Sequence, residues 1–341
     1  MLTERQRMIL NAIVDDYIRS AEPVGSRSIS KRGDVAYSAA TIRNEMADLE
    51  ELGFLEQPHT SAGRIPSIKG YRYYVDHLVK LGEVTERDLQ TIRSFFAEKM
   101  NQLEHIIQHA AMILSNMTNY TSIVLGPETF TNTLKHFQLV PISEDAAVAI
   151  IVTNTGHVEN RTVTIPPDIG MSDMERAANI LNKKLADVPI ARLKSKLYSE
   201  VGRELGRYID GCEHLLDMLG DALSGEDEHR VFLSGTTNML KQPEFKDVEK
   251  VKTLLDLLEE TPTLMRMFAS VPSGIQVRIG TENEHDAIAS CSVITATYSI
   301  DGQSLGTIGI LGPTRMDYGK VISLLDVLSK DMAVLLGRWY K

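Results

Sequence analysis

The sequence predicts an α+β multidomain protein that begins with a winged helix-turn-helix. Three observations lead to this fold class. A chain of 341 residues, of which 43% are hydrophobic, is long and apolar enough for two or three domains with their own cores. Residues 1–66 have the pattern of three helices followed by two short strands. The remainder alternates between strand-like runs and helical stretches, with a large helical piece in the middle.

The N-terminal segment opens with a capped helix. Residues 3–6 match a capping box, in which a threonine and a glutamine satisfy each other's free amides. An apolar stripe follows at helical spacing and consists of Leu10, Ile13, Val14, Tyr17 and Ile18. Residues 23–25 interrupt this helix with Pro-Val-Gly, residues 26–31 can form a short second helix, and residues 33–37 read as a turn.

A third helix is predicted to begin at Ser38 and to end before Gly53. Ser38 can accept a hydrogen bond from a free amide of the first turn, and glycine readily adopts the left-handed conformation that ends helices. The buried side of this helix is expected to consist of Ile42, Met46 and Leu49. The residues on or near the opposite side are Ala40, Arg43, Asn44, Ala47 and Glu51.

The outer side of this third helix suits the reading of DNA. Its two alanines permit close approach to a groove floor, and Arg43 and Asn44 are the residue types that make bidentate contacts with guanine and adenine. Acidic residues crowd the C-terminal half, which fits docking in which only the N-terminal turns enter the major groove. The alternative is a small three-helix domain with ordinary solvated charges.

A β-wing is predicted after this helix. Residues 54–55 read as a strand, residues 59–63 as a flexible tip and residues 64–66 as the returning strand, and Arg64 is placed to reach a phosphate or the minor groove. The predicted DNA-contacting residues are Arg27, Ser28, Lys31, Ser38, Ala40, Thr41, Arg43, Asn44, Ala47, His59, Ser61, Arg64 and Lys69.

The charge of the chain is unevenly distributed. The net charge is −10, but residues 1–81 hold eleven of the 36 basic residues and eleven of the 46 acidic ones, so all the excess acid lies downstream. A neutral module can still present a basic face to phosphates. We expect a modest affinity for each copy, which dimerisation would compensate.

The rest of the chain predicts a further α+β domain that carries an insertion. A long helix is expected over residues 85–117. Strand-like runs follow at 122–125, 136–141, 146–153 and 157–165, and the pattern is helical from residue 172. Strands return at 231–234 and 275–279, residues 291–300 and 305–311 read as a hairpin with an Asp-Gly turn, and a terminal helix starts at 319.

An apolar seam at near-heptad spacing lies in the middle of the chain. It consists of Leu197, Val201, Leu205, Tyr208, Cys212, Leu215 and Leu219. Glycines at positions 202, 206 and 211 interrupt it and would allow close approach of helices. Two interpretations remain open: the seam is buried within its own domain, or it forms a dimer interface.

Five segments carry a resemblance to a known protein family. They are TERQRMILNAIVDDYI (3–18), EPVGSRSIS (22–30), SAATIRNEMADLEELGFLEQPHTSAGRIPSIKGYRYYVD (38–76), FLSGTTNML (232–240) and SLGTIGILGPTRMDYGKVISLLD (304–326). With these segments the chain resembles the HrcA family of bacterial heat-inducible transcription repressors. The segments span nearly the whole chain, are highly specific in combination and show no departure at the matching DNA-contact positions.

This resemblance implies a three-part organisation and a regulatory function. It implies a winged helix at 1–81, a GAF-like domain formed by 84–130 and 229–341, and an inserted dimerisation domain at 131–228, with the boundaries estimated from the sequence. It also implies a homodimer that binds an inverted-repeat operator in double-stranded DNA upstream of chaperone operons such as those for GroE and DnaK. The GroEL chaperonin would modulate this repressor. The competing function is a ligand-responsive regulator whose GAF-like domain senses a small molecule.

Composition argues against a membrane protein and against a cofactor. No apolar run reaches the roughly 18 residues of a membrane span, and the N-terminus has no apolar signal-peptide core, so a cytoplasmic protein with no membrane partner is expected. Cys212 and Cys291 are the only cysteines and have no metal-ligand spacing. Neither a disulfide framework nor a zinc site is therefore expected.

Catalytic and metal-binding motifs are weak. Ser28 and Lys31 match the Ser-x-x-Lys pattern of acyl-transferring enzymes, but its companion motifs are absent, so no enzyme is expected. His105 and His109 have a metal-compatible spacing but lie opposite the apolar stripe of their helix. A further group is expected to be a solvated loop and consists of Glu282, Glu284, His285 and Asp286.

Overall fold

The chain folds into two compact units. The computed structural model describes residues 2–59, 63–82, 84–97, 103–126, 133–154, 156, 158–209, 212–223, 231–269, 274–300 and 303–337. The first unit comprises Met1–Lys99, Ile106–Gly126 and Val231–Lys341, and the second comprises Met100–His105 and Pro127–Arg230. Within the part of the chain that the structure describes, no helix has the length and apolar character needed to cross a membrane.

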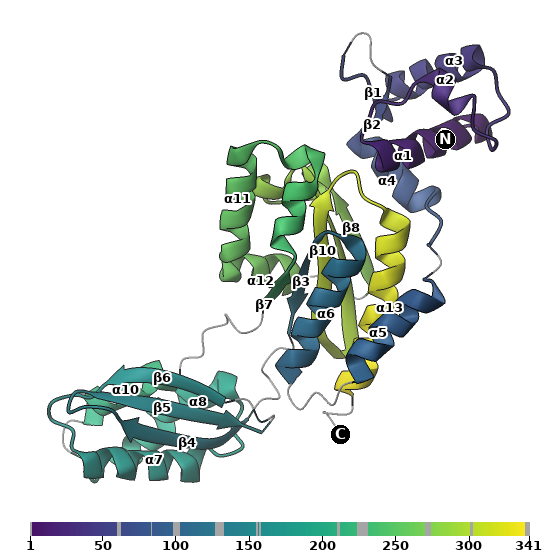
Figure 1. Ribbon diagram of the computed structural model, residues 1–341. Coiled ribbons are helices and arrows are strands. Elements are labelled where there is room, and N and C mark those ends of the chain that lie inside the picture. Colours follow the sequence, from purple (N-terminus) through teal and green to yellow (C-terminus); the bar gives the residue numbers. More distant parts are fainter. Residues whose placement is uncertain are drawn as a thin grey trace. The chain divides into compact units, whose positions relative to one another are not determined.

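The N-terminal part of the first unit is a winged helix (Figure 1). Its helices are α1 (Glu4–Ser20), α2 (Ser26–Ile29), α3 (Ala39–Glu51) and α4 (Ile68–His77), and its wing consists of β1 (Leu55–Glu56) paired antiparallel with β2 (Ile65–Pro66). The capping box predicted at the start is confirmed: Thr3 Oγ1 accepts from the Gln6 amide at 3.2 Å, and Gln6 Oε1 accepts from the Thr3 amide at 3.1 Å. Helix α4 is not among the helices that the sequence predicts.

The wing is fastened to the segment that precedes α2. The Val24 amide donates to the Arg64 carbonyl and the Arg64 amide donates to the Val24 carbonyl, both at 2.9 Å. A side chain at Gly63 would overlap with the carbonyl of Val24, so this approach requires glycine. The returning strand therefore has backbone partners on both sides, β1 on one side and Val24 on the other.

A five-stranded antiparallel sheet forms the centre of the first unit. Its strand order is β7 (Val231–Ser234), β3 (Thr121–Leu125), β10 (Gln303–Pro313), β9 (Cys291–Ile300) and β8 (Ile275–Ile279). Figure 1 shows α6 (Leu103–Thr118) and α13 (Tyr318–Leu336) on one face of this sheet, and α11 (Val248–Glu259) and α12 (Thr261–Ala269) on the other. Helix α5 (Glu86–Ala97) precedes α6, and the predicted single helix over 85–117 would cross residues 98–102, which lie outside the described residues.

Both faces of this sheet are buried. Cys291, Val293 and Leu311 pack in a core cluster with residues of α11 and α12. Ser292 faces the opposite way and hydrogen-bonds to the Tyr318 hydroxyl on α13 at 2.8 Å. Alternate residues along each strand therefore pack on opposite faces of the sheet, as expected from the two-residue period of a strand.

Glycines allow β10 to pass close to its neighbours. A side chain at Gly306 would overlap with the Tyr298 hydroxyl and with the Leu125 carbonyl, and a Cβ at Gly309 would lie 2.7 Å from the Phe268 ring. These glycines are packing residues in the interior of a sheet, where a Cβ has no space.

The second unit is a three-stranded antiparallel sheet with helices on one side. The strands are β4 (Leu134–Pro141), β5 (Ala146–Thr153) and β6 (Val158–Thr164), with β5 in the middle. The helices are α7 (Met171–Leu185), α8 (Ile190–Lys196), a π-helical segment (Leu197–Val201), α9 (Gly202–Leu205) and α10 (Cys212–Leu223). Their apolar residues form one core with alternate residues of the strands, such as Phe137, Ala149 and Ile151.

Most of the near-heptad seam belongs to this core, so of its two interpretations the structure supports burial within its own domain. Five of its side chains are completely buried within the unit, namely Leu197, Val201, Leu205, Leu215 and Leu219. The reason is that α9 ends at Leu205 and α10 begins at Cys212, so the two halves of the seam lie on different helices that contact each other. Tyr208 is 58% exposed beside the Arg176 guanidinium, and Cys212 is half-buried against the core.

Candidate nucleic-acid interface

Helix α3 begins with the predicted serine cap. The Ser38 hydroxyl accepts from the Thr41 amide at 3.1 Å and hydrogen-bonds to the Thr41 hydroxyl at 2.9 Å. The first turn contains no acidic residue, so its free amides and positive partial charge face outward without a competing carboxylate. Gly53 follows the helix with φ +77°, the left-handed conformation predicted for it.

The two sides of α3 divide as predicted. Ile42, Met46 and Leu49 are buried, whereas the opposite side is exposed and carries Ala40, Arg43, Asn44 and Ala47. The Arg43 and Asn44 side chains make no hydrogen bond or ion pair with any residue that the structure describes. Both are therefore available to a ligand, and the two small alanines leave room for it to approach the helix.

The acidic C-terminal half of α3 is partly neutralised by arginines. Arg5 on α1 donates to Glu45 at 3.1 Å, and its guanidinium lies 5.1 Å from the centre of the Tyr37 ring. Arg64 on the wing donates to Glu50 through Nε at 2.8 Å and lies 2.7 Å from it through a terminal nitrogen. These pairs reduce the negative potential that α3 would present to phosphates.

The short helix α2 carries three of the predicted contacts on its exposed surface. Arg27, Ser28 and Lys31 are all exposed, and neither basic side chain has a hydrogen bond or ion pair with another described residue. Helix α2 packs against α3. These two cations therefore lie on the helix adjacent to α3 and remain free to bind phosphate.

The two predicted DNA-contacting cations of the wing region, Arg64 and Lys69, have partners within the winged helix. Arg64 is only 19% exposed because its guanidinium holds Glu50, and Lys69 donates to the Leu52 carbonyl at 2.7 Å while its ammonium lies 4.5 Å from the centre of the Phe54 ring. The end of a helix presents carbonyls without partners, which attract nearby cations. Both cations thus fasten the wing to the end of α3. His59 is exposed, and Ser61 lies outside the described residues.

Two further arginines of the winged helix are occupied by internal ion pairs. Arg32 bridges Asp16 at 2.6 Å and Asp34 at 2.8 Å, and its hydrogen bonds lower the pKa of the Asp34 carboxyl. Arg72 on α4 is paired with Glu282 of the central sheet unit. Arg27, Lys31 and Arg43 are therefore the basic side chains that the described surface around α2 and α3 leaves unpaired.

The described residues contain no cluster of three or more His, Cys, Asp or Glu side chains with suitable geometry to hold a metal ion. Glu282, from the loop that was predicted to be solvated, instead forms an ion pair with Arg72 and accepts from the Ile279 amide at 2.8 Å. A contact between residues 210 positions apart leaves no signal in a local sequence pattern.

The fold and the exposed face of α3 define a winged-helix DNA-binding protein. The family model described as "Winged helix-turn-helix transcription repressor, HrcA DNA-binding" matches residues 1–77. The family model described as "HrcA protein C terminal domain" matches residues 104–322. The chain belongs to the HrcA family of transcription repressors.

Curated relatives match over the whole chain. The heat-inducible transcription repressor HrcA of Brevibacillus brevis is 53% identical over 98% of this chain and 98% of its own length. The protein with the same name from Bacillus pumilus is 51% identical over 100% of this chain and 99% of its own length. A crystal structure at 2.2 Å resolution, described as that of a hypothetical protein, has a TM-score of 0.71 at 25% identity, with 99% of both chains covered.

Proposed function

We propose that this protein is a heat-inducible transcriptional repressor that binds an inverted-repeat operator of chaperone operons as a homodimer in the cytoplasm. The observation that carries the proposal is the exposed, unpaired Arg43 and Asn44 on α3, beside the unpaired cations Arg27 and Lys31. Two bidentate base-reading side chains flanked by phosphate-binding cations are what sequence-specific binding requires. The name of its relatives, heat-inducible transcription repressor HrcA, supports the same function.

A binding titration tests this function. Two duplexes of equal base composition are compared, one with the inverted repeat from DNA upstream of a chaperone operon and one with its halves scrambled. We expect the repeat to bind at least about 10³-fold more tightly. Two phosphate-binding cations per copy, Arg27 and Lys31, give four per dimer, so log affinity should fall with log salt concentration with a slope of about −4. Equal affinity for both duplexes would exclude the proposal.

The GroEL chaperonin is the proposed modulator. In this scheme GroEL keeps the repressor in its active fold, and unfolded proteins compete for GroEL during heat shock, so that repression ends. A loss of one or two kcal/mol in folding free energy changes the active population severalfold, so a repressor of marginal stability suits this mechanism. The titration is therefore repeated with GroEL added, and the fraction of protein able to bind the repeat should rise.

Base reading is assigned to two side chains of α3. We expect Arg43→Ala and Asn44→Ala each to lose about 1–3 kcal/mol of binding free energy on the operator. Each variant should also bind almost equally well to operators in which the base pair contacted by the native side chain is changed. Lys31→Ala is the matched control, because a phosphate contact should weaken binding to all sequences alike. Binding to single-base variants of the operator measures both effects. Uniform losses for all three variants would contradict the assignment.

Dimerisation is assigned to the open face of the sheet in the second unit. The helices of this unit pack on the other face, where the core residues lie. The open face, defined by the strand register, consists of His136, Gln138, Val140, Ala146, Val148, Ile150, Val152, Val158, Asn160, Thr162 and Thr164. None of these positions is Asp, Glu, Lys or Arg, with the exposed Lys135 beside them at the bulge of β4, and Val158 is 55% exposed.

A second copy of the chain is the occupant that this face fits. A twofold interface places the same patch of each protomer against the other, so a patch with charges of one sign would repel itself. An uncharged face rich in β-branched residues avoids this repulsion and offers apolar area to bury. In this proposal the dimer therefore uses the sheet, while the apolar seam on the helices stays inside each protomer.

The competing function, a small-molecule sensor, would need a ligand pocket. The gap beneath α11, lined by residues such as Tyr120, Met239 and Phe245, is too narrow to admit even a water molecule and is therefore not such a pocket. A groove of about 700 Å³ lies between β6 and α10. Its arginine, Arg161, is already paired with Glu159.

A further inference from the structure

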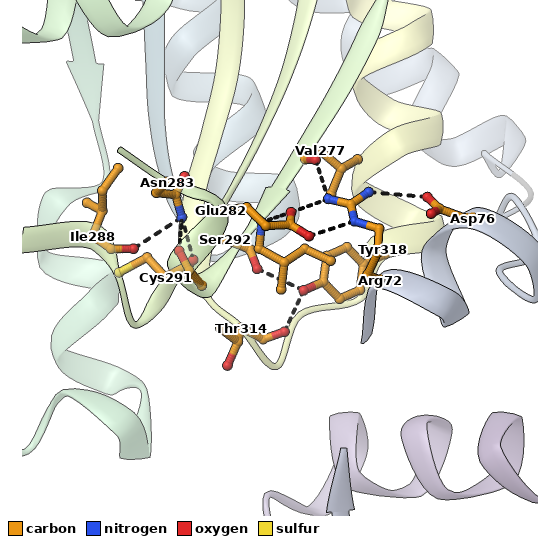
Figure 2. A network of polar contacts seen from close by, with 12 residues as sticks. Arg72, Asp76, Val277, Glu282, Asn283, Ile288, Cys291, Ser292, Thr314 and Tyr318 are labelled. Atoms are coloured by element: carbon orange, nitrogen blue, oxygen red, sulfur yellow. Dashed lines mark hydrogen bonds and ion pairs between the residues drawn. The ribbon is translucent and has the colours of Figure 1, made fainter. Parts of the chain in front are cut away.

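Two of the segments that carry the family resemblance have residues with no part in DNA reading. One is the end of the 38–76 segment, which forms α4, and the other is the GPTRMDYG stretch at 312–319, which leads into α13. The structure brings these two segments together at a junction between the winged helix and the central sheet (Figure 2). We call this junction the seat; it consists of Ile68, Tyr71, Arg72 and Tyr74 on α4, Ile18 on α1, and Val277, Gly280, Glu282, Arg315, Tyr318 and Gly319.

Arg72 fastens α4 to the central sheet. Its Nε donates to Glu282 Oε1 at 2.8 Å, one terminal nitrogen donates to the other oxygen of Glu282, and the same nitrogen donates to the Val277 carbonyl at 2.6 Å (Figure 2). A guanidinium that binds a carboxylate through two nitrogens is fixed in direction as well as in position. The ion pair with Arg72 opposes the effect of burial and holds the pKa of the Glu282 carboxyl below its ordinary value.

Arg315 fastens α1 by capping its C-terminal end. One terminal nitrogen donates to the Ile18 carbonyl at 2.6 Å, and Nε donates to Glu244 at 2.6 Å. The last carbonyls of a helix have no partner within the helix and carry negative partial charge, so an arginine is well suited to bind one of them. This cap comes from a residue 297 positions away in the sequence, and its side chain is only 12% exposed.

Tyr318 connects these contacts to the core. It is fully buried, and its hydroxyl donates to the Thr314 carbonyl at 2.6 Å and hydrogen-bonds to Ser292 of β9. Its ring lies 5.9 Å from the ring of Tyr71 and 6.5 Å from that of Tyr74. Aromatic rings at such distances pack favourably and resist sliding.

Glycines bring the two backbones into close contact at the seat. A Cβ at Gly280, which has φ +58°, would lie 2.6 Å from Ile68 Cδ1. A side chain at Gly319 would overlap with the Lys80 carbonyl, and the Gly82 amide donates to the Gly319 carbonyl at 3.2 Å. The winged helix is thus held by close packing in addition to its covalent connection.

We infer that Arg315 and Glu282 are positioning residues that fix the direction of α3 relative to the central sheet and thereby narrow the range of half-site spacings that the dimer accepts. Helices α1 and α4 both pack within the winged helix, α1 directly on α3, so holding both of them leaves α3 no independent rotation. Two rigidly held reading helices match one spacing on a DNA helix of about 10.5 base pairs per turn, whereas flexibly tethered ones tolerate several. The inference rests on the proposed function, since it concerns a dimer bound to an inverted repeat.

The double variant Glu282→Gln with Arg315→Gln tests the inference, because it loosens the seat without changing any residue of the winged helix. Full-length protein is titrated with operators whose half-sites are separated by the natural spacing and by two or five additional base pairs. We expect the native protein to bind the operator with its best spacing at least about tenfold more tightly than the other operators. For the variant, this difference in affinity should be less than about threefold. A duplex with a single half-site should bind both proteins equally.

A matched control and a measurement without DNA complete the test. Arg161→Gln removes a comparable arginine–glutamate pair from the second unit and should retain the native preference for spacing. Trypsin cleavage after Lys80, beside the seat, should be at least about fivefold faster in the double variant, because local opening exposes this bond. Glu282→Gln alone, which keeps an oxygen for the Ile279 amide, should give an intermediate result if the double variant proves unstable.

Three outcomes distinguish the possibilities. An unchanged spacing profile in a folded double variant would overturn the inference. If the double variant lost as much affinity for the single half-site as for the full operator, the inference would also be overturned, because these residues would then act through the folding of the winged helix. If the native protein binds no inverted repeat at all, the proposed function fails, and the trypsin rate alone decides whether Arg315 and Glu282 hold the winged helix in place.

Discussion

Ile150→Glu should convert the protein from a dimer to a monomer and lower its affinity for the operator by at least about 100-fold. Ile150 lies in the middle of the open face of the second unit, between Gln138 on β4 and Asn160 on β6. In the proposed dimer, a glutamate at this central position would be buried against the partner copy. Burying an unpaired carboxylate costs several kcal/mol.

The loss of affinity follows from the loss of one of two binding modules. A dimer that binds both half-sites has an affinity about 10²–10⁴-fold higher than that of a single module, without any new contact. A monomeric Ile150→Glu protein would retain only the binding of one half-site, and its affinity for a duplex with a single half-site should be unchanged. Sedimentation velocity measures the oligomeric state, and a titration with both duplexes measures the affinities.

Ser195→Glu is the matched control for this variant. It adds the same charge to the same unit, but at an exposed position on α8, outside the open face. It should remain dimeric with native affinity. If Ile150→Glu also remains dimeric and folded, the dimer does not use the sheet, and a different surface has to account for the binding of an inverted repeat.

The helices of the winged helix that bear local signals could be predicted from the sequence. Ser38 caps α3 through a hydrogen bond to an amide three residues away, and Gly53 adopts a left-handed conformation directly after it. The two sides of α3 follow from helical spacing alone. Such features depend on residues within one or two turns, so the necessary information is local.

The partners of the charged side chains could not be predicted in this way. Arg64 and Lys69 are predicted to contact DNA, and this stays a prediction, but their partners within the protein, Glu50 and the Leu52 carbonyl, were not foreseen. The sequence identifies a cation near the wing, whereas its partner depends on how the wing folds back on α3. Arg315 illustrates the same limit, because its contact with Ile18 spans 297 residues.

Helices α4, α11 and α12 were also missed, although apolar residues such as Leu254 and Leu258 lie at helical spacing in α11. The near-heptad spacing from Leu197 to Leu219 was read as a single seam, but the chain leaves the helix after α9 and starts α10 at Cys212. Periodicity thus indicated burial correctly and could not identify what the residues pack against.

Gly70→Ala should destabilise the winged helix by about 2 kcal/mol and weaken binding to every DNA sequence. Gly70 is buried in the first turn of α4, where an added Cβ would overlap with the carbonyl oxygen of Phe54. This oxygen also accepts from the Ser67 amide at 3.1 Å, so it cannot withdraw without moving the chain at the start of the wing. Its displacement would disturb the segment that joins α3 to β1.

Two opposing effects decide the sign of this prediction. Alanine favours a helix over glycine by up to about 1 kcal/mol, whereas forcing a carbon into a closely packed backbone costs about 1–3 kcal/mol or more. The neighbour here is a backbone carbonyl rather than the end of a flexible side chain, so the cost should exceed the gain. Thermal unfolding of the N-terminal domain and a titration with operator DNA measure the two consequences.

Gly33→Ala provides the matched control, because a Cβ at this exposed position meets nothing within 4 Å and the backbone is not left-handed. Its stability should stay within about 0.5 kcal/mol of that of the native protein. A Gly70→Ala protein of native or higher stability would mean that α4 can shift away from the wing at little cost. Such a shift would also move Arg72 on the same helix, and the seat could then not fix the direction of α3.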